Sequence, residues 1–214
     1  ISFISTYKYM YPYITYVEGL YVNGRHPMVS RNQALEFLKM YLKDEKMVKH
    51  CIAVEAIMKS LARRLGEDEE LWGFTGLLHD IDYDYVDRDM NRHGVEALKI
   101  LADVLPEEAL QAIAGHNEYN GYVVTDEKAL KILYALRASD HASGLVIATA
   151  LVMPHRKLEE VKLDTLIRKF RSKDFARGVD RSRIMEIEKL GLKLEEFLEI
   201  ALQSLKNIAK ELGL

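Results

Sequence analysis

The sequence predicts an all-α protein in which one domain accounts for residues 28–214. From Ser30 onward the apolar residues recur at helical spacing, and helix start and stop residues agree with that period. Only four of the 214 residues are proline, and no internal repeat, low-complexity tract or linker-like stretch divides the chain. Hydrophobic residues make up 49% of the chain and charged residues 29%. This composition is typical of a globular protein with one sizeable core.

Residues 1–27 differ in composition from the rest of the chain. They contain half of the twelve tyrosines, and the Tyr-x-Tyr alternation has the period of a strand rather than of a helix. The segment lacks the basic start and the small-residue cleavage site of a secretory signal. We interpret it as either a leader or a docking arm.

Individual helix boundaries follow from capping residues. Ser30 and Gln33 have the spacing of a capping box. Gly66 is a typical helix end, Asp68 a typical N-cap, and Pro106 marks a new first turn. We therefore expect helices over about 30–42, 46–65, 68–78, 91–105, 106–116, 126–140 and 194–212, with an aspartate-rich loop over 82–89 and a less regular basic region over 155–183.

Charge and cysteine content limit the partners and the compartment. The formal net charge is −3 and the sequence pI about 6.2, which gives no basic surface for duplex nucleic acid. Cys51 is the only cysteine, so the chain cannot form an internal disulfide, and a reducing compartment is expected. No stretch approaches the roughly 18–20 apolar residues of a membrane helix. We expect a soluble cytoplasmic protein, with a homodimer as one open alternative.

The histidines and aspartates of the chain include candidate ligands for a metal ion. Imidazole and carboxylate are common donors for zinc, manganese and iron, and no set of cysteines competes as a thiolate site. The pair His79-Asp80 follows the apolar Leu77-Leu78, a position at which two ionisable groups need a partner. The candidate set, in chain order, is His50, His79, Asp80, His93, His116 and Asp140.

The order of these residues resembles a known family. His50, then His79-Asp80 in Gly-Leu-Leu-His-Asp-Ile-Asp, then Asp140 in Ala-Ser-Asp resembles the H…HD…D signature of the HD superfamily. The resemblance covers about residues 50–140. It implies a helical bundle in which His50, His79, Asp80 and Asp140 ligate one divalent metal ion, with iron, manganese, zinc, nickel and magnesium all open.

Two further histidines resemble those of the two-metal HD branch, especially the bacterial diadenosine tetraphosphate hydrolases. His93 is followed by glycine at a helix start, and His116 closes the next helix. The resemblance implies that His93 and His116 bind a second metal ion and that Asp80 bridges the pair. Asp82 replaces the glycine of the commoner HDIG form, which leaves the subfamily open.

Neighbouring charged residues are candidates for the remaining chemistry. Besides Asp80, which should matter most, we consider Asp82, Asp84 and Glu118 as candidate catalytic acids or bases, with solvated loop acids as the alternative. Candidate phosphate contacts are Lys49, Arg92 and Arg137.

The other charged groups have simpler interpretations. The basic segment 168–183 is either a lid over the metal site or a solvated helix face. We expect His141 to be a neighbour of the ligands or neutral, and His26 and His155 to be solvated.

The function that these features favour is hydrolysis of a phosphate ester or anhydride, preferably in a nucleotide, by metal-activated hydroxide. A di-iron oxygenase is an alternative, because an oxygenase branch of the superfamily shares the ligand order. A non-catalytic metal- or nucleotide-binding module is a third. Oxygen consumption without phosphate release would favour the second, and ligand retention without turnover the third.

Overall fold

A computed structural model of the chain describes residues 30–214. The prediction for residues 1–27 and that for His26 lie outside this part of the chain. All regular structure in the described residues is helical, which confirms the all-α fold. The elements are α2 (Arg31–Tyr41), α3 (Glu45–Leu65), α4 (Glu69–Leu78), α5 (Val95–Ile100), α6 (Glu107–His116), η1 (Glu118–Asn120), α7 (Glu127–Leu151), η2 (Leu158–Glu160), α8 (Leu163–Arg171), α9 (Arg181–Met185), η3 (Glu186–Leu190), α10 (Leu194–Asn207) and α11 (Ala209–Leu212).

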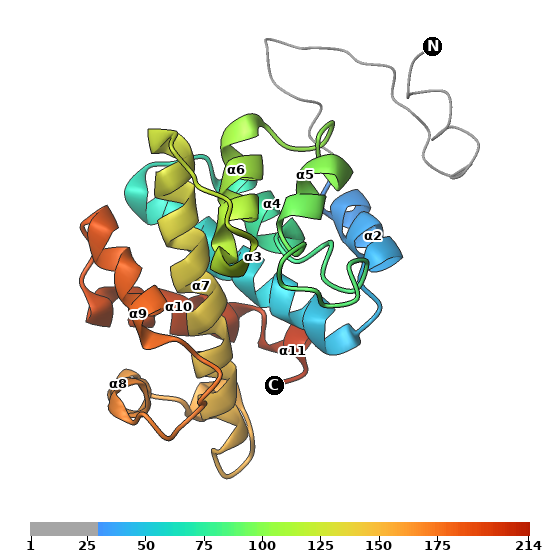
Figure 1. Cartoon of the computed structure of the whole chain (residues 1–214). Coiled ribbons are helices and arrows are strands. Elements are labelled where there is room, and N and C mark those ends of the chain that lie inside the picture. The colour runs from blue at the N-terminus through green and yellow to red at the C-terminus, as the bar shows by residue number, and fades with distance from the viewer. Residues whose placement is uncertain (1–29) are drawn as a thin grey trace, which may run out of the picture.

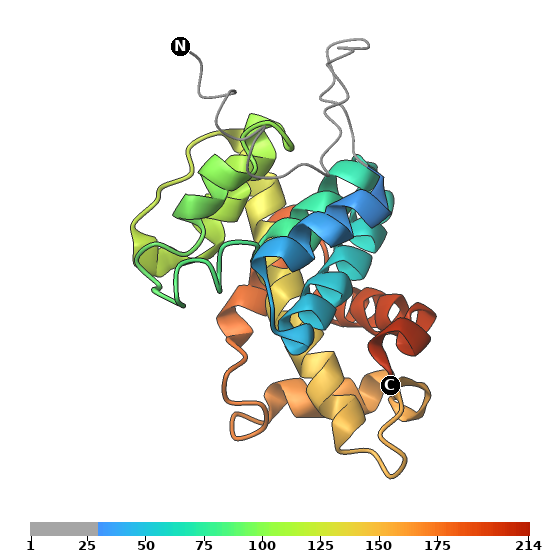
Figure 2. The same ribbon diagram turned by 90° about the vertical axis from the view of Figure 1, so that its right-hand side faces the viewer.

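The long helix α7 runs through the middle of the molecule, and the other helices pack around it (Figures 1 and 2). It contacts α3, α6, α8, α9 and α10, and α3 also packs against α4 and α10. One cluster of buried apolar side chains joins these helices, with Trp72 and Phe197 among its largest fully buried members. The fold thus brings segments that are far apart in sequence against one central helix.

The predicted helix starts and stops are confirmed. Ser30 and Gln33 form the capping box, each side chain accepting a hydrogen bond from the backbone of the other. Gly66 ends α3 in the left-handed region at φ 73°, a conformation in which a Cβ is unfavourable. Asp68 and Asp126 accept hydrogen bonds from the first-turn amides of α4 and α7.

Other predicted boundaries were wrong. The expected helix over 91–105 shortens to α5, because Gly94 has φ 86° at its N-cap and the helix already ends at its C-cap, Leu101. The helix expected to end at Asp140 continues to Leu151 and includes Gly144, since its apolar residues continue at helical spacing and no proline lies between. The last predicted helix is split between α10 and α11, and the basic region contains α8 and α9.

Two glycines on α4 set how closely it approaches α3. A Cβ on Gly76 would lie 3.1 Å from the backbone nitrogen and Cα of Glu55. A Cβ on Gly73 would overlap the side chain of Lys59. This close packing places His79, at the end of α4, beside His50 of α3, with ring centroids 5.3 Å apart.

None of the helices in the described part of the chain is both long and apolar enough to cross a membrane.

Candidate metal centre

The structure brings all six predicted ligands together. They come from separate segments of the fold: His50 from α3, His79 and Asp80 from the end of α4, His93 from the turn before α5, His116 from the end of α6 and Asp140 from α7.

The first group surrounds one oxygen of Asp80. Asp80 Oδ2 lies 3.3 Å from His79 Nε2 and 3.7 Å from His50 Nε2. Asp140 Oδ1 lies 3.0 Å from His50 Nε2. These four residues are the predicted ligands of the first metal ion, and three of them, His50, His79 and Asp80, offer donor atoms within 4.8 Å of one another.

The second group surrounds the other oxygen of Asp80. Asp80 Oδ1 lies 3.3 Å from His93 Nε2 and 3.4 Å from His116 Nε2. The two Nε2 atoms are 3.1 Å apart. Asp80 is therefore shared by two groups of imidazoles, one at each carboxylate oxygen.

Backbone carbonyls orient two of the four imidazoles. His79 Nδ1 donates to the carbonyl of Gly76 at 2.8 Å, and His116 Nδ1 donates to the carbonyl of Ile113. Both acceptors are carbonyls in the last turn of a helix, where intrahelical partners are missing. Because these carbonyls hold Nδ1–H, Nε2 of each ring is directed at Asp80.

Side chains orient the other two imidazoles. The Ser143 hydroxyl donates its one proton to the carbonyl of Asp140 at 2.7 Å, so its oxygen accepts from His50 Nδ1 at 3.2 Å. His93 Nδ1 donates to Asp82 Oδ1 at 2.8 Å. All four rings therefore present Nε2 to the centre, as metal-ligating histidines do when a second group holds the other nitrogen.

Electrostatics distribute protons unevenly over the metal-free centre. Burial lowers the pKa of His79, but the charge of Asp80 outweighs it and raises that pKa to about 9. Burial also opposes protonation of His93, whose hydrogen bonds to Asp80 and Asp82 raise its pKa to about 10. Burial, together with the charges of His93 and His79, lowers the pKa of His116. At neutral pH, His93 thus donates a proton within the second group and His116 accepts.

The spacing of the donors fits divalent metal ions. Two ligands about 2.0–2.1 Å from one ion lie roughly 2.9–3.4 Å apart at octahedral or tetrahedral angles, and the three distances of the second group fall in that range. His79 Nε2 is buried and has no hydrogen-bond partner, whereas buried polar atoms are normally satisfied. A metal ion bound at this nitrogen would supply the missing partner.

One side of the centre is open to solvent. The side chains of His50 and Asp140 are 21% and 25% exposed, whereas that of His79 is completely buried. Asp80 and His93 are also buried. A substrate would therefore approach the centre from the side of His50 and Asp140.

The three other candidate acids occupy different environments. Asp82 is completely buried, so the interpretation of it as a solvated loop acid is wrong. Asp84 accepts from the backbone amide of Lys43 at 2.9 Å and ties the loop to the start of α3. Glu118 is largely exposed and pairs with Arg183.

The three candidate phosphate-binding cations have structural partners. Lys49 donates to the carbonyl of Leu212 at 3.0 Å. Arg137 donates to the carbonyls of Gly115 and His116 at the end of α6. Arg92, with its side chain 50% exposed, forms a long ion pair with Glu96 at 3.7 Å. Arg92 is thus the candidate with the most freedom to meet a ligand.

The basic segment folds around one of its own arginines. Arg181 donates to backbone carbonyls between residues 170 and 179, among them those of Ala176 and Val179 at 2.7 Å each. Lys173 and Arg177 remain exposed. His141 accepts from the amide of Asp180 at 3.1 Å, which ties this segment to α7.

Sequence reasoning missed the groups that orient the ligands. Ser143 lies three residues after Asp140 on the same helix, a spacing that places them on neighbouring turns. That spacing was the available signal. The carbonyls of Gly76 and Ile113 each lie three residues before a predicted ligand at a helix end. Because every residue has a backbone carbonyl, the sequence does not show which of them accepts a hydrogen bond from a side chain.

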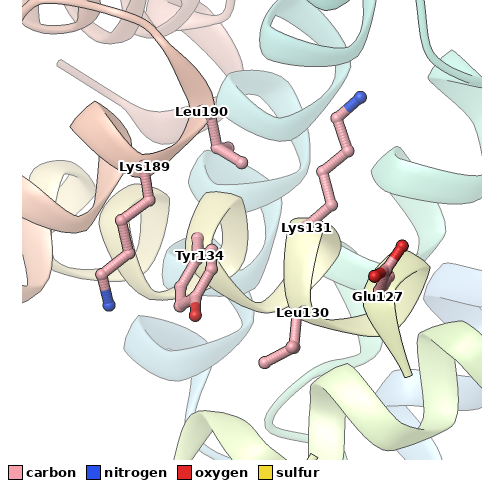
Figure 3. A pocket seen from close by; sticks show the side chains of 6 residues that line it. All are labelled: Glu127, Leu130, Lys131, Tyr134, Lys189 and Leu190. Carbon is pink, nitrogen blue, oxygen red and sulfur yellow. The ribbon is translucent and has the colours of Figure 1, made fainter. Parts of the chain in front are cut away.

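A shallow pocket lies elsewhere, between the start of α7 and η3 (Figure 3). Its lining residues are Glu127, Leu130, Lys131, Tyr134, Lys189 and Leu190. Lys189 Nζ lies 4.1 Å from the centre of the Tyr134 ring. The lining contains no candidate ligand.

Residues 47–149 match the family model of the HD domain. This segment contains all six candidate ligands, and the match supports the HD superfamily of metal-dependent phosphohydrolases. HD domains bind divalent metals and are usually hydrolases. Searches of curated proteins and of solved structures found no match.

Proposed function

We propose that this chain is a metal-dependent phosphohydrolase that cuts a phosphate ester or anhydride, with a nucleotide as the preferred substrate. The observation that carries the proposal is the shared carboxylate of Asp80, whose two oxygens face separate groups of imidazole nitrogens. His50, His79 and Asp140 would complete a first metal site, and His93 and His116 a second.

Divalent ions held there would lower the pKa of a bound water, supply hydroxide for attack on phosphorus and neutralise the phosphoryl oxygens. The chain's own contribution is to hold the ligands in place. Four imidazoles whose Nδ1–H groups are held by acceptors keep Nε2 directed at Asp80 before any ion binds. An ion would take the place of the protons that Nε2 of His79 and His93 carries at neutral pH.

The remaining roles follow from exposure. The open side at His50 and Asp140 would admit the phosphoryl group. Arg92 would contact phosphate, because its guanidinium is half exposed and its ion pair with Glu96 is long, at 3.7 Å. Glu118 is the exposed candidate for protonating the leaving oxygen, provided that a substrate displaces it from Arg183. Asp82, without an exposed atom, is excluded from substrate contact.

The experiment combines metal analysis with turnover. Purified protein is assayed for bound divalent metals, for phosphate release from mono-, di- and dinucleotides, and for oxygen consumption. Asp80→Ala should remove bound metal and phosphate release together. Asp174→Asn is the matched control, because the Asp174 side chain is 93% exposed and pairs only with the neighbouring Arg177 among the described residues.

Two outcomes would overturn the proposal. One is full phosphate release by the metal-free Asp80→Ala variant. The other is oxygen consumption, or tight nucleotide retention, without phosphate release from any member of the panel.

A further inference from the structure

The buried carboxylate of Asp82 is the feature that the proposed function leaves unexplained. It stands two residues after Asp80 in the aspartate-rich loop, yet no part of its side chain is exposed. A buried carboxylate is costly unless several donors satisfy it. Its partners therefore indicate why an acid stands at this position.

Three donors hold Asp82. Oδ1 accepts from His93 Nδ1 at 2.8 Å. Oδ2 accepts from the backbone amides of Gly94 at 2.7 Å and Ala97 at 2.9 Å. The two amides belong to the N-terminus of α5, whose N-cap residue Gly94 has no side chain to cap it. Asp82 thus caps α5 and fixes the ring of His93 with the same carboxylate.

The consequence for His93 is a single tautomer. Because a carboxylate only accepts hydrogen bonds, Nδ1 must carry a ring proton, and Nε2, which faces Asp80 Oδ1 and His116, is the nitrogen left to bind a metal ion. Of the four imidazoles, His93 alone is held by a carboxylate, whereas His79 and His116 use carbonyls and His50 a hydroxyl. A carboxylate partner also increases the basicity of a ligating imidazole.

We propose that Asp82 is a positioning residue for the second metal site: it selects the tautomer of His93 that can ligate and fixes that ring to α5. The inference rests on the metal-binding part of the proposed function and is independent of the substrate. Asp82 itself touches neither metal nor substrate.

Asp82→Asn is the discriminating variant, since it keeps the shape of the side chain. The amides of Gly94 and Ala97 still need an acceptor, so the amide oxygen takes the place of Oδ2. The amide NH₂ then faces His93 Nδ1 and donates to it. The ring proton must move to Nε2, which removes the lone pair that the second metal needs.

The test is a titration of metal-free protein with zinc or manganese, read as stoichiometry and affinity by calorimetry and by metal analysis after dialysis. The wild type should bind two ions, and His93→Ala one. Asp82→Asn should resemble His93→Ala, with second-site affinity lower by about 10- to 100-fold, the usual effect of losing such a partner. Asp68→Asn is the matched control, because Asp68 caps α4 and asparagine caps equally well.

The two proposals fail differently. Two ions bound by Asp82→Asn with wild-type affinity, while His93→Ala binds one, would overturn the role of Asp82 alone. No metal bound by the wild type would overturn the metal centre and with it the proposed function. A second measurement needs no variant: nitrogen NMR of the zinc-loaded wild type should show His93 protonated at Nδ1, and a metal-bound Nδ1 would contradict the proposal.

Discussion

At the scale of single residues, the candidate centre depends on groups that hold the far side of each imidazole. A carbonyl, a hydroxyl and a carboxylate each serve the same purpose, which is to keep the proton on Nδ1. Without that constraint a histidine ring can rotate or change tautomer, and the distance from its Nε2 to Asp80 is no longer fixed. The ligand geometry is thus present before any ion binds.

Metal binding should release protons at neutral pH. In the metal-free protein the pKa values of His79 and His93 are raised from 6.5 to about 9 and about 10. Their stabilisation of the metal-free fold is complete below about pH 6.5 and is lost as pH rises through those values. An ion must displace these protons, so its affinity should rise with pH up to about 10.

Calorimetry at pH 7 in two buffers of different ionisation enthalpy measures this release directly. Equal binding enthalpies in the two buffers would show that no proton leaves, and would contradict the assignment of protonated His79 and His93.

At the scale of helices, the approach of α4 to α3 sets the distance between His79 and His50. The two glycines of α4 that face α3 meet different neighbours. Gly76 faces the backbone at Glu55, which cannot move alone, whereas Gly73 faces the flexible side chain of Lys59. The same substitution at the two positions therefore has different consequences.

Gly76→Ala should destabilise the protein by about 1–2 kcal/mol net, because the new methyl group pushes α4 from the backbone of α3. Gly73→Ala should cost less, because only the side chain of Lys59 must move, at the expense of its hydrogen bond to Glu55, and alanine favours the helix. Urea unfolding monitored by circular dichroism compares the two. Equal effects of the two substitutions would show that α3 and α4 separate easily.

At the scale of the whole molecule, the candidate ligands join α3, α4, α6 and α7 through one buried carboxylate. A ligand that binds only the folded state raises its free energy of unfolding by mass action. Metal ions should therefore act on the stability of the entire bundle and not only on activity.

Addition of a chelator to the metal-loaded protein should lower its melting temperature. At a free metal concentration of 100 times the dissociation constant, the bound ion adds about 2.7 kcal/mol to the free energy of unfolding. The measurement is a thermal scan with and without chelator, with Asp80→Ala as the comparison. A chelator shift of equal size in that variant would mean that the stabilising ion binds elsewhere.

Sequence reasoning predicted the fold class because it depends on local patterns, whereas metal binding by the candidate ligands stays a prediction. Capping residues such as Ser30, Asp68 and Gly66 indicate where helices begin and end. The HD-like order of histidines and aspartates selected five residues that the structure groups around Asp80, and a sixth, Asp140, that pairs with His50. It could not predict that Asp82 is buried, because a polar loop sequence is typical of solvent exposure, and its three donors come from residues 11 to 15 positions later.

The phosphate-binding candidates show the same limit. Lys49 and Arg137 adjoin or precede ligands in sequence, yet their side chains bind carbonyls of α11 and α6. Which way a long cation points depends on tertiary neighbours rather than on its position in the chain.

The spacing of the six side chains along the chain also orders events during synthesis on the ribosome. Asp80, His93 and His116 are all made before α7, so the second set is complete in a nascent chain that still lacks Asp140. The first set needs α7, the helix against which most of the core packs. Yet α6, which carries His116, packs against α7, and Arg137 of α7 donates to the carbonyl of His116. The geometry of both sets would therefore form only after the central helix has docked.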